Sequence, residues 1–373
     1  MRSSAAEGGD GPGPGRRWRI LTALLVLGLG FTVIPPVRAG TKGVLLLAEA
    51  LPSPIHPLRW ITPEPRRSEI RLPDTRADLY RPRGFSEPPG LVLVHGANPQ
   101  GKDDPRIRAL AGGFARSGRE VLVPQLELRH QRLDLADLDR IRSAVRHLAR
   151  TQKVGIVAFS YGAGLALVAL GGSDELQNHV AFVATFGTYF DLLHVVQGVT
   201  TGIVPSPSGP LRWRTEPHAR DLAAEQLSGF LGPEYHATFM AAWQRRDPEG
   251  LDDAYRSLYE LLTNRDPARV PRLAAQIPEP LRRLLASLSP SRVASRIRFP
   301  VLALHARDDP AAPPSESVLL VQAVHRRGSR VFEVGIFQHV TPTGSPLRRL
   351  GDGLRLAHFT GLVLSAQEGL PRL

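Results

Sequence analysis

The stretch "VGIVAFSYGAGLALVAL", residues 154–170, joins a hydrophobic run to a run of small residues around one serine. The first part, which ends at Phe159, is apolar without alternation, as in a strand buried on both faces of a sheet. The second part begins at Ser160, and Gly162 and Gly164 allow a helix to start close to that strand. A helix N-terminus favours negative charge beside it. The stretch therefore predicts a reactive serine, although a serine can also occupy a strand–helix turn without any chemistry.

Hydrophobic segments on both sides extend this pattern into a sheet. Strands are predicted at 68–72, 77–82, 90–96, 119–126, 153–160, 180–187, 298–306 and 329–337. Helical patterns lie between them, at 105–117, 134–151, 161–171, 314–326 and 346–366. Alternation of apolar strands with helices is typical of a doubly wound sheet. We expect the α/β class, with a mostly parallel eight-stranded sheet.

One interval interrupts the alternation. Residues 189–295 contain helical patterns and no convincing strand, so we expect a helical cap inserted into the sheet domain. The core would then comprise residues 68–188 and 296–373, and the Pro-rich residues 52–67 would be a linker. The cap contains six large aromatic residues, of which we expect a minority to line a substrate pocket and the rest to form the core of the cap: Phe230, Tyr235, Phe239, Trp243, Tyr255 and Tyr259.

The serine turn resembles the nucleophile elbow, G-x-S-x-G, of the α/β-hydrolase superfamily. Here Ala158 stands where the first glycine is usual, and Gly162 provides the second. The resemblance extends over about residues 68–366 without the cap. It implies a catalytic triad in the chain order Ser, acid, His, with Ser160 as the nucleophile.

The acid and the base follow two late strands. "HARDDPAAPP" (305–314) resembles the acid loop of the superfamily, and its spacing selects Asp309, with Asp308 as the alternative. "FQHVTP" (337–342) follows the last strand and makes His339 the expected base. We expect structural roles for His305, at a strand end, and for His358, in the last helix.

The segment "LVLVHGANPQGKDDPR" (91–106) resembles a nucleotide-binding P-loop at first sight. Pro99 removes an N–H from the loop, and Asp103 stands where a P-loop has the Ser or Thr that binds Mg²⁺. In the α/β-hydrolase superfamily this loop completes the oxyanion hole, which would use the backbone N–H groups of Ala97 and Tyr161. Lys102, Asp103, Asp104 and Arg106 are then expected to pair with one another or cap the next helix.

The N-terminal segment is a separate problem. Residues 1–19 are basic and Gly/Pro-rich, which is typical of a disordered tail. Residues 20–51 contain the apolar run 20–34, preceded by Arg16, Arg17 and Arg19, and a second run at 44–51 that could lie against a membrane. A membrane anchor, a signal peptide cut near "VRAG" (37–40) and a soluble helix all remain open. On the anchor interpretation, a chain starting near Leu51 should still fold.

The composition excludes disulfide bonds, thiolate metal sites and a cysteine nucleophile, because the chain of 373 residues contains no cysteine. The net charge is +12. The positive charge comes mostly from dispersed arginines, so we expect no nucleic-acid partner. The resemblance implies hydrolysis of a carboxylic ester or a related acyl bond, with a small or lipid-like substrate and neither metal nor organic cofactor. The alternative is a membrane-anchored scaffold of the same fold without activity.

Overall fold

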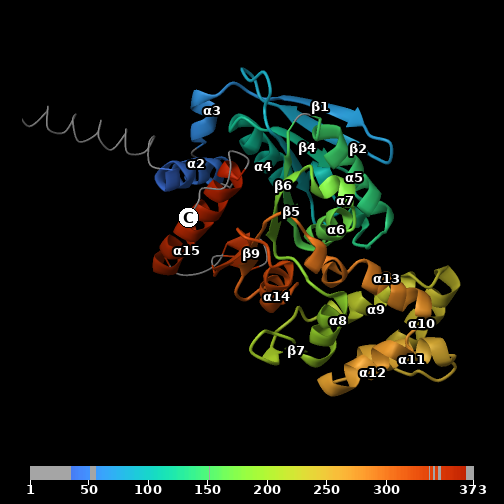
Figure 1. Cartoon of the computed structure of the whole chain (residues 1–373). Helices are drawn as coiled ribbons and strands as arrows, with labels where there is room; N and C mark the ends of the chain where they lie inside the picture. The colour runs from blue at the N-terminus through green and yellow to red at the C-terminus, as the bar shows by residue number, and fades with distance from the viewer. Residues whose placement is uncertain are drawn as a thin grey trace, which may run out of the picture.

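The computed structural model describes residues 35–50, 56–150, 152–335, 337–338, 341–342 and 346–366. An eight-stranded sheet runs through it in the order β1–β2–β4–β3–β5–β6–β9–β10 (Figure 1). Strand β2 is antiparallel to β1 and to β4, and all the other neighbours are parallel. The predicted doubly wound sheet is therefore confirmed. Its strands are Arg66–Arg71, Arg76–Arg81, Gly90–Val94 (β3), Glu120–Pro124 (β4), Val154–Phe159 (β5), Val180–Phe186 (β6), Val301–Ala306 (β9) and Arg330–Val334 (β10).

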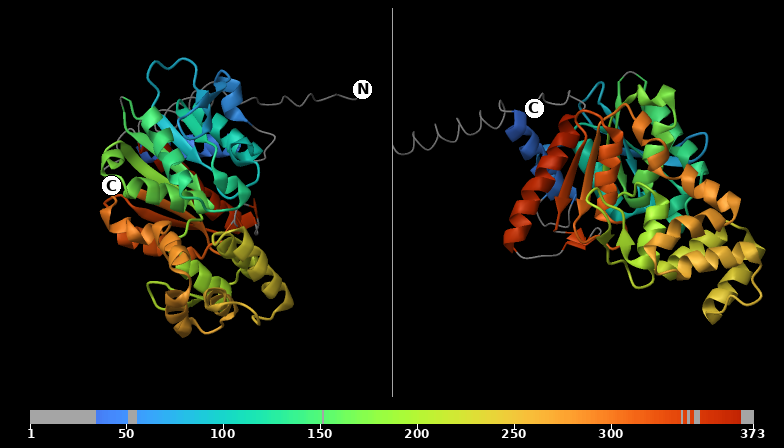
Figure 2. Two further views of the ribbon diagram at one scale, coloured as in Figure 1. Left: turned by 90° about the vertical axis from the view of Figure 1, so that its right-hand side faces the viewer. Right: turned by 60° about the horizontal axis from the view of Figure 1, so that its bottom comes forward.

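Helices cover both faces of this sheet (Figure 2). On one face, α5 (Ala136–Leu148), α6 (Ser160–Gly171) and α14 (Pro314–Val324) contribute to one apolar cluster. On the other, α4 (Pro105–Arg116) and α15 (Pro346–Ser365) contribute to a second cluster. Strands β3 and β9 are buried along their whole length, as are all but the last residue of β5, which explains why their sequences are apolar apart from His305 of β9.

Helix α2 (Pro35–Ala50) is part of the second cluster. Leu46 is fully buried there together with Phe114 of α4 and Phe359 of α15. A side chain at Gly43 would collide with the backbone of α15 at Ala357, so the two helices cross in close contact. Among the described side chains at 44–49, only Val44 is strongly exposed. The run expected to lie against a membrane thus packs largely on the protein, and a chain starting at Leu51 would lose a core helix.

The interval between β6 and β9 forms a separate layer of helices below the sheet in Figure 1. Its helices are α8 (Leu192–Thr201), α9 (Ala219–Gly229), α10 (Pro233–Arg245), α11 (Asp253–Thr263), α12 (Val270–Gln276) and α13 (Glu279–Ser287). One detail differs from the sequence analysis, because Ile203–Val204 and Leu211–Arg212 form a short antiparallel pair, β7 and β8. Two-residue strands are too short to show a periodicity in the sequence.

The predicted linker, residues 52–67, contains regular secondary structure. Helix α3 (Pro57–Ile61) lies inside it, and β1 already begins at Arg66. Residues 1–34, with the apolar run 20–34, lie outside the described residues. Among the helices that the structure describes, none is both long and apolar enough to cross a bilayer. Before the last helix, β11 (Phe337–Gln338) and β12 (Thr341–Pro342) form a short antiparallel pair.

Candidate active site

Ser160 stands at the junction of β5 and α6 with a backbone φ of +51°. That value is in the left-handed region, which a residue with a side chain seldom adopts. Among the described residues, four residues other than glycine have a positive φ. Of these four, only Ser160 lies between a buried strand and a buried helix. Such strain costs about 1–3 kcal/mol and persists where packing imposes it, commonly at functional sites.

Close packing around the turn explains its small residues. A side chain on Gly162 would collide with the carbonyl oxygen of His95, and one on Gly164 would collide with the ring of Tyr189. A side chain on Gly96 would come within 3.1 Å of the Ser160 Cβ. Ala158 is fully buried at the end of β5, so the methyl group that replaces the usual glycine is accommodated.

The predicted oxyanion groups border the same cavity as Ser160. Ala97 follows β3, and Tyr161 is the second residue of α6, where a helix leaves its N–H groups without intrahelical acceptors. Within the described part of the chain, the N–H of Ala97 donates to no acceptor. Both groups therefore face the cavity without an acceptor among the described residues.

His95 fixes the start of the loop that carries Ala97. Its Nε2 accepts a hydrogen bond from the Leu126 N–H at 3.1 Å, and its Nδ1 lies 2.8 Å from the Gly96 carbonyl oxygen. This pair of partners requires a neutral imidazole with the proton on Nδ1. Burial lowers the pKa of His95, which agrees with that state. The ring is thus a structural bridge between β3 and the residues after β4.

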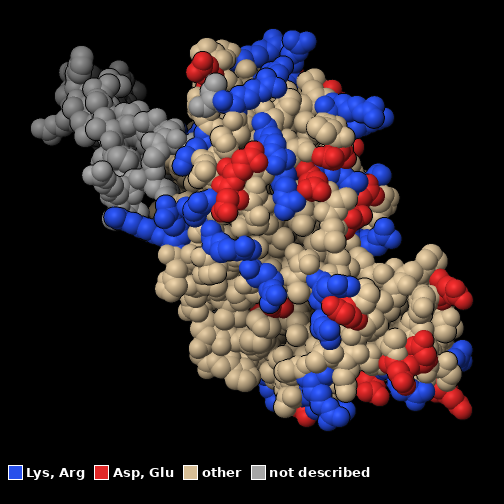
Figure 3. All heavy atoms as spheres, turned by 45° about the vertical axis from the view of Figure 1, so that its right-hand side comes forward, with Lys and Arg blue, Asp and Glu red and all other residues tan. Residues whose placement is uncertain are grey.

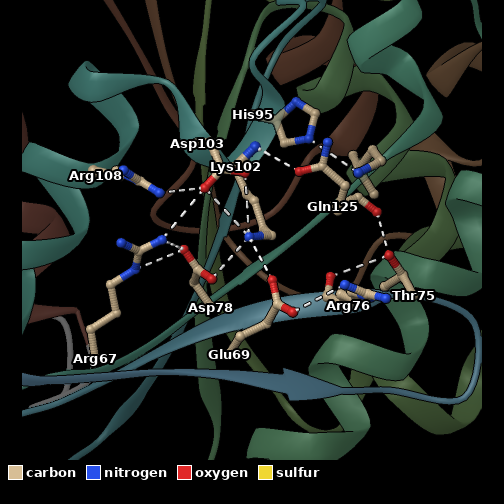
Figure 4. A network of polar contacts seen from close by, with 11 residues as sticks. Arg67, Glu69, Thr75, Arg76, Asp78, His95, Lys102, Asp103, Arg108 and Gln125 are labelled. Atoms are coloured by element: carbon tan, nitrogen blue, oxygen red, sulfur yellow. Dashed lines mark hydrogen bonds and ion pairs between the residues drawn. The ribbon is translucent and has the colours of Figure 1, made fainter.

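Lys102 of the same loop is engaged by carboxylates. Its buried Nζ lies 3.0 Å from Asp78 Oδ1 of β2 and 3.1 Å from Glu69 Oε2 of β1, and its N–H donates to Gln125 (Figure 4). A P-loop lysine must instead reach a phosphate. The P-loop interpretation is wrong for this geometry, because moving Lys102 to a phosphate would leave the buried Asp78 with one cation fewer.

The expected pairing of the neighbouring charges is confirmed. Asp104 caps α4 by accepting from the Arg106 N–H at 2.7 Å, and it also binds the Arg106 guanidinium. Asp103 pairs with Lys102 and with Arg108. Together these contacts make residues 95–106 a fixed loop, which keeps the Ala97 N–H in a defined place.

Asp309 is buried in the loop that follows β9, at the carboxyl ends of the parallel strands, where Ser160 also lies. Its Oδ1 accepts from the N–H groups of Ala311, at 2.8 Å, and Ala312, at 3.2 Å. Burial, reinforced by the negative charge of Asp309, raises the pKa of Tyr161 to about 12, so the acid lies within electrostatic reach of the residue after Ser160. The alternative acid, Asp308, is exposed. The geometry favours Asp309.

Of the three histidines weighed in the sequence, His339 lies outside the described residues, and its contact with Ser160 or Asp309 stays a prediction. His358 is exposed on α15, with its ring 5.9 Å from that of Phe332. His305 is fully buried at the end of β9. Ala97, Ser160 and Tyr161 therefore border one cavity, and Asp309 directly precedes two further residues that border it, whereas the predicted base, His339, is not among the described residues.

A cavity of about 460 Å³ opens at Ser160 between the core and the cap. Ala97, Ser160, Tyr161 and the acid-loop residues Pro310 and Ala311 border it on the core side. The cap side is mainly apolar and includes Leu192, Val195, Val196, Val199, Leu227 and Phe230. The volume is within the usual range of small-molecule sites.

The cap aromatics divide as expected. Of the six, only Phe230 borders this cavity. Phe239, Trp243 and Tyr259 pack against one another, with the rings of Trp243 and Tyr259 5.6 Å apart, and the rings of Tyr235 and Tyr255 lie 4.8 Å apart in a tilted arrangement. The minority role in the pocket, and the structural role of the rest, agree with this arrangement.

The strand order, the antiparallel second strand and the strained serine after the central β5 occur together in one architecture. The chain has the α/β-hydrolase fold. In this fold, loops at the carboxyl ends of the parallel strands carry the site. Ser160 after β5 and Asp309 after β9 both satisfy that rule.

Comparison with solved structures gives several similar chains. The chain is similar to an esterase of Pyrobaculum calidifontis, with 18% identity, a TM-score of 0.48 and 88% of each chain covered. It is also similar to the acylaminoacyl peptidase of Pyrococcus horikoshii, with 15% identity, a TM-score of 0.44, and 81% of this chain and 41% of that one covered. A puromycin hydrolase is similar at 17% identity and a TM-score of 0.47, with 83% of this chain and 40% of that one covered. The chain thus spans about two fifths of the acylaminoacyl peptidase and of the puromycin hydrolase. No protein-family model and no curated protein sequence matches it.

Sequence reasoning missed the contacts that join the acid loop and α14 to the cap. Trp213, beside β8, donates from Nε1 to the Asp309 carbonyl oxygen at 2.7 Å. Glu316 of α14 is fully buried and accepts from the N–H groups of Phe190 and Asp191, where the cap begins, at 2.8 Å each. These pairs are more than 90 positions apart, so no local pattern could reveal them. Among the described residues, no group of three or more acidic or histidine side chains is placed to hold a metal.

Proposed function

We propose that the protein is a serine hydrolase that cleaves a carboxylic ester with an apolar acyl chain. The observation that carries this proposal is the strained Ser160 at the floor of an apolar cavity. A serine held at φ +51° costs stability, and chemistry at its hydroxyl gives that strain a reason. The α/β-hydrolase fold supports the proposal, since this turn is the place of the nucleophile in the fold.

In the proposed mechanism, His339 takes the proton of Ser160, and the Ser160 Oγ attacks the ester carbonyl carbon. The Ala97 and Tyr161 N–H groups hold the resulting oxyanion, each contributing about 3–4 kcal/mol in the transition state. Asp309 stabilises the imidazolium of His339, which then protonates the departing alcohol. Water, deprotonated by His339, attacks the acyl-enzyme and releases the acid, and Ser160 recovers its proton.

The cavity supports an ester with an apolar acyl chain over a peptide. Its cap side consists mainly of Leu and Val side chains of α8, α9 and α13, which suit an alkyl chain. Thioesters, amides and lactones use the same chemistry. We expect p-nitrophenyl esters of increasing chain length to be hydrolysed and the matching peptide anilides to be cleaved more slowly. Faster cleavage of the anilides would replace the esterase by a peptidase.

The identity of the acid can be tested with two neighbouring carboxylates. Asp309→Asn should leave the fold intact but misdirect the tautomer of His339, an effect of roughly 10⁴-fold on kcat in a serine protease. Asp308→Asn should change kcat little, because Asp308 is exposed. Ester hydrolysis by the two purified variants measures both. If Asp308→Asn is the damaging change, the acid has been assigned to the wrong residue.

We also propose that residues 20–34 attach the protein to a membrane and that the partner is a lipid-like substrate rather than nucleic acid. On the face drawn in Figure 3, basic side chains are scattered among acidic ones. Trp60 and Ile61 of α3 are 72% and 71% exposed, and tryptophan is favoured at membrane interfaces. The full-length chain should fractionate with membranes. Recovery of uncleaved chain in the soluble fraction would contradict the anchor, and a mature N-terminus at Gly40 would support a signal peptide.

A further inference from the structure

His305 occupies a place beside the acid that the proposed mechanism does not use. It lies in β9, four positions before Asp309, and its side chain is fully buried. It does not border the cavity at Ser160. A buried histidine must have its two ring nitrogens satisfied, so its partners reveal its state.

The partners of His305 define its tautomer. Nε2 lies 3.1 Å from the Ala312 carbonyl oxygen and 3.5 Å from Asp309 Oδ2. Both are acceptors only, so Nε2 carries a proton. Nδ1 lies 2.7 Å from the Ser317 Oγ of α14, and this hydroxyl can donate to it. The ring is thus oriented by α14 and directs its N–H at the acid loop.

The same loop holds the other oxygen of the acid. Asp309 Oδ1 accepts from Ala311 and Ala312 N–H groups, so the peptide groups of Ala312 interact both with Asp309 and with His305. Oδ2 is the oxygen that faces His305. A buried carboxylate oriented from both sides keeps one rotamer, and a base that depends on it keeps one tautomer.

We infer that His305 is a positioning residue for Asp309, and that Ser317 in turn orients His305. This inference rests on the proposed function, because Asp309 matters only if it acts as the acid of the triad. The chain Ser317–His305–Asp309 would make α14 a support for the site. Loss of the Ser317–His305–Asp309 contacts should lower kcat without altering the cavity at Ser160.

The first test compares two substitutions of His305. His305→Leu removes the N–H that faces Ala312 and Asp309. We expect kcat for p-nitrophenyl butyrate to fall by roughly 10–100-fold, the effect usual for residues that orient metal-binding side chains, with little change in KM. His305→Gln can place an amide N–H near the position of Nε2 and should recover most of kcat. Ser317→Ala is the milder variant, with an intermediate loss. His358→Leu, on the exposed face of α15, is the matched control and should behave as the wild type.

The second test separates positioning from general destabilisation. In the Asp309→Asn background, His305→Leu should no longer slow labelling by a fluorophosphonate. His305 is inferred to act on the triad only through Asp309, and that carboxylate is already absent. An equal factor in both backgrounds would overturn the inference, as would wild-type kcat in the folded His305→Leu variant or no recovery with His305→Gln. The proposed function fails separately, if the wild type itself neither labels nor hydrolyses the ester, and the inference then fails with it.

Discussion

At the scale of single residues, the fold depends on how closely three backbones approach at the serine turn. Gly162 faces the carbonyl oxygen of His95, and Gly96 faces the Ser160 Cβ. A methyl group at Gly162 would clash with that oxygen, and one at Gly96 would be tightly packed at 3.1 Å from the Ser160 Cβ. The positive φ of Ser160 is therefore imposed by strand β3, strand β5 and helix α6 together, and not by the serine itself.

This packing predicts opposite effects of one substitution at two glycines. Gly162→Ala should lower the free energy of unfolding by about 1–3 kcal/mol, since the new methyl overpacks the turn. Gly112→Ala, inside α4, should raise it by up to about 1 kcal/mol, because alanine favours the helix. At Gly112 no atom lies within 4 Å of the added methyl position. Urea unfolding of both variants measures the difference; equal changes would contradict the packing account.

At the scale of elements, the cap helix α8 forms much of the cavity wall. Leu192, Val195, Val196 and Val199 all border it. Val196→Trp should shorten the space for an acyl chain. If two or three methylenes lose contact, at about 0.8 kcal/mol each, kcat/KM for the longest good ester falls roughly tenfold or more, while that for the acetate is retained.

The control for this chain-length prediction lies in the same cap. Trp243→Phe alters the aromatic core of the cap and no residue that borders the cavity. It should leave the chain-length profile unchanged. If Val196→Trp reduces activity on short and long esters alike, the cavity is not the acyl pocket.

The junction of cap and core gives a pH dependence. His194 of α8 lies 3.0 Å from the buried Glu316 of α14. Burial lowers the pKa of His194, but the hydrogen bond and charge of Glu316, with a contribution from Asp191, outweigh burial and raise it overall. A raised pKa means that protonated His194 stabilises the fold below its unfolded pKa of about 6.5, and this contribution is lost as the pH rises through the raised value.

A comparison of stabilities tests this junction. The difference in free energy of unfolding between the wild type and His194→Gln should be largest near about pH 6 and smaller near about pH 9. His147→Gln serves as a control, because burial and the charge of nearby arginines lower the pKa of His147. For this residue the difference in free energy of unfolding should change with pH in the opposite direction. A difference for His194 that grows with pH would contradict the ion pair.

The elements of the sheet were predictable because the central strands have mainly apolar sequences and helical stretches alternate with them. The resemblance to the α/β-hydrolase superfamily also predicted the tight turn at Ser160 and selected the loop that carries Asp309. It could not identify His305 with Ser317, Trp213 with Asp309, or Glu316 with the start of the cap. These contacts join segments that become neighbours only when the sheet is assembled. The two-residue strands β7 and β8 were missed for lack of length.

At the scale of the whole molecule, α2 is a core helix and not only a connection to the N-terminal segment. Leu46 is fully buried between α4 and α15, so Leu46→Ala should cost about 2–5 kcal/mol. A chain that begins at Pro35 should keep the stability of the full-length chain, and a chain that begins at Leu51 should lose it. Thermal unfolding of both measures this. Equal melting temperatures would show that α2 contributes little.

The central claim is that Ser160 is an activated nucleophile. The most direct measurement is mass spectrometry of the full-length protein after reaction with a fluorophosphonate, which labels a serine only where a base and oxyanion donors activate it. The account predicts one label per chain, on a peptide that contains Ser160, no label in Ser160→Ala and severely slowed labelling in His339→Ala. Folded protein that takes up no label, or labels equally after Ser160→Ala, would contradict the account and leave an inactive scaffold of the same fold.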